Sequence, residues 1–311
     1  MTLSPTTLAW AAHIAQQHAP LQIGTPLSVH EVVQRPGEDT LEPPFAAALL
    51  GARMLGFIEA DAQTIARAWL RQSQRCGGFD PSAWPEEPSD FELPAWPRAN
   101  GFAPCPKALG LYAVLPNAAW VARMAQAGVP TLQLRFKSPN PQAIAQEIQA
   151  AVQAVQGTSS LLFINDHWQH AIDAGAYGVH LGQEDLDSAD LPAIQQAGLR
   201  LGLSTHGYAE MRRADALSPS YIAMGAVFPT TLKNMPTAPQ GLGRLATYAR
   251  LMRHHSLVAI GGIDLTRLDA VCQTEVGSIA VVRALVEAPN PEATARDWMA
   301  RLQNPLRPSV V

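Results

Sequence analysis

The C-terminal two thirds of the chain alternate short apolar runs with longer amphipathic stretches. The apolar runs are rich in Val, Ile and Leu without strict polar alternation, which is typical of parallel strands covered on both faces. Eight such runs occur, at residues 109–115, 131–136, 161–164, 178–181, 201–203, 221–227, 257–260 and 278–282. The pattern therefore predicts eight parallel strands.

The stretches between these runs have helical periodicity. In residues 141–155, Ile144, Ile148, Ala151 and Val155 recur at helical spacing and can form one buried stripe. Eight strand and helix alternations in about 200 residues predict an α/β fold, a closed (β/α)8 TIM barrel. An open, doubly wound sheet is the alternative architecture.

The residues before the barrel have a different organisation. Residues 1–77 predict a small, mostly helical module, with helical patterns near 5–18 and 44–72 and short strands around 21–33. Residues 78–106 contain seven prolines and isolated aromatic residues, which predict an extended linker before the barrel domain at 107–311. A module of about 75 residues is near the lower limit for a stable core, so we expect it to pack on the barrel or on a second copy of itself. The second case would make the protein a homo-oligomer.

Composition excludes several classes of partner. A net charge of -4 and a pI near 6.1 provide no general basic field for nucleic acid or an anionic membrane. The three cysteines lack the spacing of a zinc site or a disulfide framework, which suits a reducing cytoplasm. The start of the chain lacks the pattern of a signal peptide, and the apolar stretch 45–60 is interrupted by Arg53 and Glu59. We therefore expect a cytoplasmic globular protein.

Cationic and amide side chains cluster where the predicted strands end, which is the rim where barrel enzymes carry their chemistry. Strand alternation brings Gln133, Arg135 and Lys137 to the same side after the second strand. Lys233 follows the sixth strand and adds a third cation. These side chains predict a local site for an anion.

Two acidic residues follow neighbouring strands at the same rim. The third strand ends at Asn165 and Asp166, and Asp185 lies in the loop after the fourth strand. Carboxylates from adjacent strand ends can share a hard cation such as Mg²⁺, which also binds substrate phosphates. The sequence therefore predicts a magnesium site formed by Asp166 and Asp185.

Hydroxyl groups and glycines complete the rim. Ser204 ends the fifth strand, and Thr230 and Thr231 follow the sixth. After the seventh strand, Gly261 and Gly262 would let backbone amides approach a phosphate, which is the usual phosphate site of these barrels.

The segments at these strand ends resemble those of the thiamine-phosphate synthase family. The matching segments are residues 133–137, 163–166, 178–185, 202–206, 225–230 with Lys233, and 259–263, in family order. The resemblance implies a transferase of thiamine biosynthesis. Such an enzyme joins 4-amino-2-methyl-5-(diphosphooxymethyl)pyrimidine to thiazole phosphate and releases diphosphate, with Mg²⁺. Departure of diphosphate can leave a stabilised pyrimidine cation, so no protein nucleophile is needed.

The same resemblance implies a role for each rim residue. Arg135, Lys137, Lys233 and Ser204 are expected to act on the leaving group as catalytic residues, and Asp166 and Asp185 to bind Mg²⁺. The expected substrate-binding residues are Gln133, Arg135, Lys137, Asn165, Ser204, Thr230, Thr231, Lys233, Gly262, Val282 and Arg283. The last two belong with Thr230 and Gly262 to the expected thiazole phosphate site.

Two positions depart from the family pattern. Leu232 stands where the family has a threonine, and Arg283 stands where it usually has a serine. An arginine at the end of the eighth strand would either bind a phosphate more strongly than a hydroxyl or crowd the pocket. The thiazole side of the site is therefore where this chain differs most from the family.

The N-terminal module resembles the last helices of the hydroxymethylpyrimidine phosphate kinase that precedes the synthase in some bifunctional proteins. The glycine-rich segment expected before its helix is here Glu42, Pro43 and Pro44, and about 75 residues cannot supply a complete nucleotide site. The module is thus expected to be a degenerate remnant that does no chemistry.

Two other functions remain open at this point. A thiazole tautomerase shares this barrel and would use His206 for proton transfer. A non-catalytic sensor of thiamine precursors would keep the phosphate pocket, with the N-terminal module as its interaction surface. His206 is otherwise expected to be structural, and His167, His170, His254 and His255 are expected at the surface.

Overall fold

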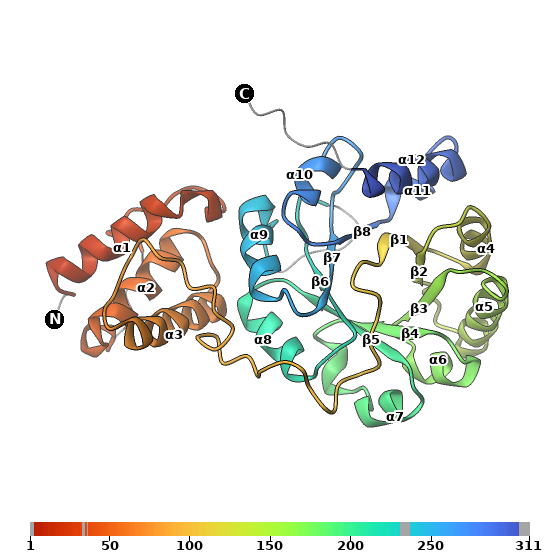
Figure 1. Ribbon diagram of the computed structural model, residues 1–311, viewed down its shortest axis with the longest axis horizontal. Coiled ribbons are helices and arrows are strands. Elements are labelled where there is room, and N and C mark those ends of the chain that lie inside the picture. Colours follow the sequence, from red (N-terminus) through yellow and green to blue (C-terminus); the bar gives the residue numbers. More distant parts are fainter. Residues whose placement is uncertain (1–2, 33–34, 36, 231–236, 305–311) are drawn as a thin grey trace.

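Eight parallel strands close into a barrel in the computed structural model of the chain (Figure 1), so the predicted (β/α)8 fold is confirmed. The structure describes residues 3–32, 35, 37–230 and 237–304. Each strand pairs with the next in sequence, and β8 pairs with β1. The strands are β1 (Gly110–Leu115), β2 (Thr131–Leu134), β3 (Leu161–Asn165), β4 (Gly178–Leu181), β5 (Arg200–Thr205), β6 (Tyr221–Met224), β7 (Ser256–Ile260) and β8 (Ser278–Val281).

Helices surround the barrel and cover the outer face of the strands. They are α4 (Ala118–Gln126), α5 (Pro141–Ala154), α6 (Trp168–Ala174), α7 (Leu191–Gln196), α8 (Tyr208–Ala216), α9 (Gly241–Leu251), α10 (Leu268–Cys272), α11 (Arg283–Val286) and α12 (Pro291–Gln303), with the 3-10 turn η3 (Asp185–Asp187) after β4. The predicted stripe on α5 is buried at Ile144, Ile148 and Ala151. In the described part of the chain, no helix has the length and apolar character needed to cross a membrane.

Two apolar layers make up the barrel core. The layer between strands and helices contains the outward-facing aliphatic residues, such as Leu132, Ile164 and Leu201. The layer inside the barrel is more aromatic and contains Tyr112, Phe163 and Tyr221. The predicted sixth strand was too long, because β6 ends at Met224 and residues 225–227 are buried in the loop beyond it. Backbone hydrogen bonds to the neighbouring strands continue past Met224, from Gly225 to the Thr205 carbonyl (3.1 Å) and from Val227 to the Ile260 carbonyl (2.9 Å).

The N-terminal module is helical, as predicted, but its details differ from the sequence pattern. It contains α1 (Pro5–Gln17), η1 (Ala19–Leu21), η2 (Glu38–Thr40), α2 (Pro43–Met54) and α3 (Glu59–Cys76). The single helix predicted over 44–72 was wrong, because the chain turns at Gly56, which adopts a left-handed φ of 75° and where an added Cβ would lie 2.3 Å from the carbonyl oxygen of Ile23. The strands expected around 21–33 are absent from the described residues of that range, where η1 and turns occur instead.

The module packs on the barrel of its own chain, beside α8 and α9 (Figure 1). Buried Arg244 of α9 donates one hydrogen bond to the carbonyl of Leu21 (2.9 Å) and another to that of Leu55 (2.8 Å). These carbonyls end η1 and α2. The Arg244 guanidinium also lies 3.5 Å from the ring centroid of Phe57. A barrel helix thus supplies a donor to the Leu21 carbonyl and a second donor to the Leu55 carbonyl, which also accepts the backbone N–H of Ile23 at 3.1 Å.

The segment 78–106 has no helix or strand; it first packs on α1 and α3 of the module and then passes along the barrel to β1 (Figure 1). Phe91 is buried and stacks on Tyr208 at 5.1 Å between ring centroids. Further along, Arg98 forms a 2.6 Å ion pair with buried Asp215. The expectation of a surface position for His255 was wrong, because its imidazole is buried and bonds the same carboxylate at 2.7 Å. The segment is therefore packed over much of its length.

Replacement of Arg244 tests how much the module and the barrel stabilise each other. Arg244→Ala leaves the Leu21 carbonyl without this donor and the Leu55 carbonyl with the backbone N–H of Ile23 alone, so we expect the free energy of unfolding to fall by about 2–5 kcal/mol. The matched control is Arg250→Ala on the same helix, which removes an exposed ion pair with Glu86 and should cost less than about 1 kcal/mol. Urea unfolding measures both, and equal small losses would contradict this account.

Candidate active site

One cavity of about 810 Å³ opens at the carboxyl ends of the strands, and residues from all eight strands or their following loops line it. Eleven of the sequence-predicted site residues lie on its wall, namely Gln133, Arg135, Lys137, Asn165, Asp166, Asp185, Ser204, Thr230, Gly262, Val282 and Arg283. Thr231 and Lys233, with Leu232, lie outside the described residues. The site residues that the sequence predicts and the structure describes therefore surround a single cavity.

The β2 side of the cavity carries two of the cations that line it, Arg135 and Lys137. Gln133 is buried at the strand, and its Nε2 donates to the Tyr112 hydroxyl at 3.0 Å. Arg135 follows β2, and its backbone N–H donates to the carbonyl of Leu115 at 2.8 Å, which extends the barrel pairing beyond the assigned strand. Lys137 is two residues further on and lines the same cavity. Strand alternation therefore directs three polar side chains into the site, as the pattern predicts.

The β3 and β4 side carries the carboxylates of Asp166 and Asp185. Asp166 has a left-handed φ of 63°, and its backbone N–H donates to the carbonyl of His180 at 3.0 Å. Asp185 accepts a hydrogen bond of 2.8 Å from the backbone N–H of Gly182. Burial raises the pKa of the Asp166 carboxyl and the charge of Asp185 raises it further, whereas Lys137 acts in the opposite direction. The two carboxylates therefore repel each other across the site, and cations relieve that repulsion.

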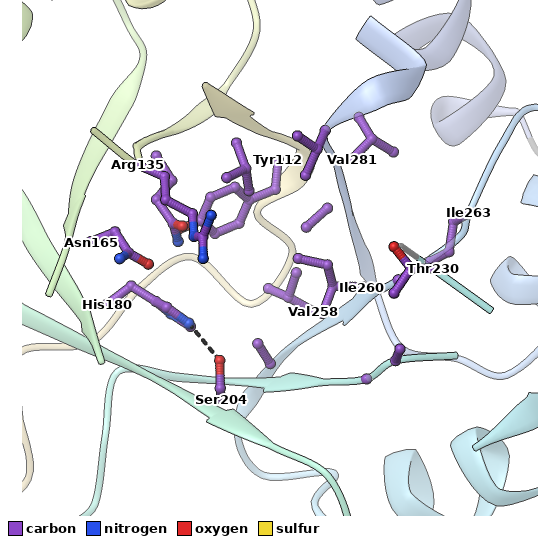
Figure 2. A pocket seen from close by; sticks show the side chains of 18 of the residues that line it. Tyr112, Arg135, Asn165, His180, Ser204, Thr230, Val258, Ile260, Ile263 and Val281 are labelled. Atoms are coloured by element: carbon purple, nitrogen blue, oxygen red, sulfur yellow. Dashed lines mark hydrogen bonds between the residues drawn. The ribbon is translucent and has the colours of Figure 1, made fainter. Parts of the chain in front are cut away.

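A buried hydrogen-bonded chain forms the floor of the cavity. His180 Nε2 lies 2.8 Å from Ser204 Oγ, the contact drawn in Figure 2, and His180 Nδ1 lies 2.7 Å from the Tyr221 hydroxyl. The hydroxyls of Tyr221 and Tyr112 are 2.7 Å apart, and Tyr112 bonds Gln133. Burial raises the pKa of both tyrosines, so both stay protonated and can act as donors.

The sequence pattern predicts no role for His180, Tyr112 or Tyr221. The sequence feature that could have pointed to these three residues is their position, because each is a polar or aromatic residue at an inward-facing place of a short strand. Inward-facing tyrosine is also common as packing, so the strand pattern alone does not separate packing from function. Their mutual contacts only appear once the barrel closes.

The loops after β6, β7 and β8 form the opposite side of the cavity. Gly261 and Gly262 have left-handed φ angles of 105° and 65°. A Cβ at Gly262 would lie 2.6 Å from the carbonyl oxygen of Pro229, so the two loops touch here. Arg267, which the sequence analysis missed, donates to the Gly262 carbonyl at 2.5 Å and lies over the Phe228 ring at 4.6 Å.

Thr230 and Arg283 are on this same side. Thr230 faces the space beside Ile263 (Figure 2). Arg283 is the first residue of α11, directly after Val282. Both line the cavity with Gly262, so a hydroxyl, a guanidinium and a glycine backbone border one region of it.

His206 also lines the cavity, after β5, and contacts an acidic residue. Its Nδ1 lies 2.7 Å from Glu210 Oε2, and its backbone N–H donates to the same oxygen at 2.9 Å. This carboxylate belongs to the first turn of α8. The orientation of His206 is thus tied to the start of that helix.

A family model described as thiamine monophosphate synthase matches residues 111–285, more than half of the chain. The chain belongs to this family. A thiamine-phosphate synthase of Neisseria meningitidis serogroup A is 56% identical over 199 residues, which are 64% of this chain and 97% of that protein. The thiamine-phosphate synthase of Cronobacter sakazakii is 52% identical over 202 residues, 65% of this chain and 93% of that protein. The predicted membership of the family, and with it the class of transferase, is confirmed.

The barrel is also similar to a solved structure, a thiamine phosphate pyrophosphorylase from Pyrococcus furiosus. The TM-score is 0.57 at 24% identity, over 64% of this chain and 98% of that chain, which supports the fold. The family match begins at residue 111, so the helical module and the segment after it lie outside it.

The contact between the loops after β6 and β7 yields a test. Gly262→Ala adds a Cβ against the Pro229 carbonyl and requires a left-handed φ, so we expect a loss of about 3 kcal/mol in unfolding free energy. Gly128→Ala is the matched control, because Gly128 has a φ of 82° with open space around it and should lose only about 1–2 kcal/mol. Thermal unfolding of the two variants measures the difference, and equal losses would mean that the loops can separate without cost.

Proposed function

We propose that the barrel joins 4-amino-2-methyl-5-(diphosphooxymethyl)pyrimidine to thiazole phosphate and releases diphosphate. The observation that carries this proposal is that two cations, Arg135 and Lys137, lie beside the carboxylates of Asp166 and Asp185 on one side of the cavity. Such a charge pattern suits a diphosphate bound together with a divalent cation. The similarity to named thiamine-phosphate synthases supports the same reaction.

Diphosphate departure is the step that the cations would promote. Arg135 and Lys137 are proposed to hold the leaving diphosphate, together with Lys233, whose role rests on the family resemblance. Negative charge grows on the leaving oxygens as the bond to the pyrimidine methylene breaks, so fixed cations stabilise the transition state more than the ground state. The thiazole nitrogen then attacks the methylene carbon, and no protein nucleophile takes part.

The floor of the cavity would orient the pyrimidine and the leaving group. Gln133 and Asn165 are proposed to hold the pyrimidine, because their amides combine donors and acceptors beside the cations. Ser204 is proposed to face the leaving group. Its hydroxyl oxygen contacts His180 Nε2, so an imidazole N–H donated to that oxygen leaves the hydroxyl proton available for a phosphate oxygen.

Asp166 and Asp185 fit a magnesium ion by the chemistry of their donor atoms. Mg²⁺ prefers hard oxygen ligands and is commonly bound by one or two carboxylates together with water and substrate phosphates. Burial raises the pKa of Asp166 and repulsion by Asp185 raises it further, and a divalent cation would relieve that repulsion. When bound, Mg²⁺ would neutralise charge on the diphosphate.

The thiazole phosphate is proposed to bind on the opposite side of the cavity. Thr230, Gly262, Val282 and Arg283 border that region, and Thr231 follows there in the sequence. Arg283 would supply a charge-assisted hydrogen bond in place of the serine hydroxyl that is usual in the family.

The other two functions receive less support. A thiazole tautomerase would use His206, whose Nδ1 already contacts the Glu210 carboxylate. Tautomerisation also needs neither paired cations nor a carboxylate pair. A sensor would bind both precursors without converting them, so an assay of turnover distinguishes it.

The proposed setting is the cytoplasm, with phosphorylated pyrimidine and thiazole as the partners. All three cysteines, Cys76, Cys105 and Cys272, are unpaired, which suits a reducing compartment. Fractionation of cells followed by detection of the chain tests this location.

Incubation of the purified full chain with both precursors and Mg²⁺ tests the proposed reaction. We expect thiamine phosphate and diphosphate to form in equal amounts. Binding of both precursors without product would favour the sensor, and isomerisation of a thiazole without use of the pyrimidine would favour the tautomerase.

Removal of either carboxylate should slow turnover strongly. Asp166→Ala and Asp185→Ala should each lower kcat by at least about a hundredfold, because uncompensated diphosphate charge raises the barrier by several kcal/mol. The control is Asp187→Ala, which changes an exposed residue of η3 paired with Arg213 and should leave kcat within about twofold. Steady-state rates at limiting Mg²⁺ measure this, and near wild-type rates for both active-site variants would move the metal site elsewhere.

Replacement of Arg283 tests the thiazole phosphate site. A charge-assisted hydrogen bond contributes about 1.5–3 kcal/mol, so Arg283→Ala should raise the KM for thiazole phosphate roughly ten- to a hundredfold. The KM for the pyrimidine should change little. Arg283→Ser should recover part of the loss, whereas tighter thiazole binding in that variant would mean that the arginine obstructs the pocket.

A further inference from the structure

The helix that begins beside Ser204 and His206 has no N-terminal cap of its own. Its N-cap residue is Gly207, which has no side chain to accept a hydrogen bond from the first turn of α8. The acceptor comes instead from the N-terminal module, where Asp61 Oδ1 accepts the backbone N–H of Ala209 at 2.9 Å. Asp61 belongs to α3 and is only 3% exposed. A carboxylate at a helix N-terminus satisfies an open N–H and interacts favourably with the helix dipole.

The barrel loop is shaped to admit this carboxylate. Gly207 has a φ of 176°, an extended conformation open to any residue, so its backbone angle does not require glycine. A Cβ at this position would, however, overlap the Asp61 carboxylate oxygen. Close approach of the module is therefore what requires a glycine at residue 207.

Only two residues separate the start of α8 from the end of β5. Thr205 ends the strand, and His206 and Gly207 connect it to Tyr208, the first residue of α8. Ser204, Thr205 and His206 all line the cavity. A shift in the first turn of α8 would thus move side chains of the site directly.

The first turn of α8 is also linked to the site through a side chain. Glu210 lies in that turn, and its carboxylate accepts the backbone N–H of His206 and contacts the imidazole. On the other side, the Tyr208 ring stacks on Phe91, and its hydroxyl accepts a hydrogen bond from the Trp84 indole at 3.0 Å. The first turn of α8 therefore contacts the module and the linker on one side and the residues of the site on the other.

We propose that the N-terminal module positions the substrate-binding loop after β5, with Asp61 as the positioning residue that caps α8. Asp61 touches no substrate and acts through Gly207 and Ala209 on Ser204 and His206. The module would thus do no chemistry and still be required for full activity. This inference rests on the proposed function for its effect on catalysis, and on the contact itself for its effect on the loop.

Point variants of the full chain test the cap. Asp61→Ala should speed amide hydrogen exchange at Ala209 at least tenfold and leave exchange at Ala113 in β1 unchanged. It should also lower kcat/KM for the pyrimidine diphosphate about tenfold, with the KM for thiazole phosphate within twofold. Asp61→Asn keeps one acceptor oxygen and should recover most of both losses.

A control in the same helix separates capping from general damage to the module. Thr64 is buried one turn after Asp61, and its hydroxyl donates within α3 to the carbonyl of Ala60. Thr64→Ala should therefore leave both the kinetics and the exchange at Ala209 close to wild type. A loss as large as that of Asp61→Ala would overturn the specific role of the cap.

A second variant changes the barrel residue that lies against the Asp61 carboxylate. Gly207→Ala should displace the Asp61 carboxylate and reproduce the exchange and kinetic losses of Asp61→Ala. In the double variant the added Cβ has room, so the loss should not exceed that of the larger single variant. Losses that multiply would show that the two residues act independently and would contradict the proposal.

Product formation and amide exchange at Ala209 together distinguish a failure of this proposal from a failure of the proposed function. If the wild-type chain makes no thiamine phosphate, the proposed function fails, and exchange at Ala209 alone decides whether Asp61 holds the loop. If the chain is active and folded Asp61→Ala shows wild-type kinetics and exchange, the positioning role is wrong while the proposed function stands.

Discussion

Pairing of β8 with β1 is the constraint on which the rest of the molecule depends. Eight parallel strands that close on themselves must direct all their carboxyl ends to one rim. Residues 150 positions apart, such as Gln133 and Arg283, therefore border a single cavity. Closure also leaves no unpaired strand edge, so the polar residues at the rim are available for ligands.

The polar aromatic side chains inside the barrel both fill its core and orient the residues of the site. Tyr112 and Tyr221 fill the core with their rings, and their hydroxyls join Gln133 to His180 in one chain of hydrogen bonds. Each buried polar group in this chain has a partner, which removes the cost of burying it. The same chain fixes the orientation of the amide and the imidazole that face the cavity above it. Packing and positioning are thus provided by the same side chains.

The helical module and the barrel stabilise each other by exchanging helix caps. Asp61 of the module meets the N-terminus of α8, whereas Arg244 of the barrel meets the C-terminal carbonyls of η1 and α2. The charges have the signs that the helix dipoles favour, negative at an N-terminus and positive at a C-terminus. The side chains of Asp61 and Arg244 are both buried, so each makes its hydrogen bonds only while the module and the barrel are in contact. This exchange explains how a module with a small core of its own can be ordered beside a catalytic barrel.

The sequence by itself determined the barrel, because eight apolar runs with intervening amphipathic stretches have few other ways to bury their surfaces. It also determined which residues stand at strand ends, so Arg135, Lys137, Asp166 and Asp185 could be assigned to one rim in advance. Only the tertiary structure decided the break at Gly56, the burial of His255 and the cap that Asp61 supplies to α8. The physical reason is that periodicity reports contacts within an element or between neighbouring strands. A hydrogen bond between side chains or backbone groups 40 to 148 positions apart depends on how separate elements dock, and no local pattern encodes it.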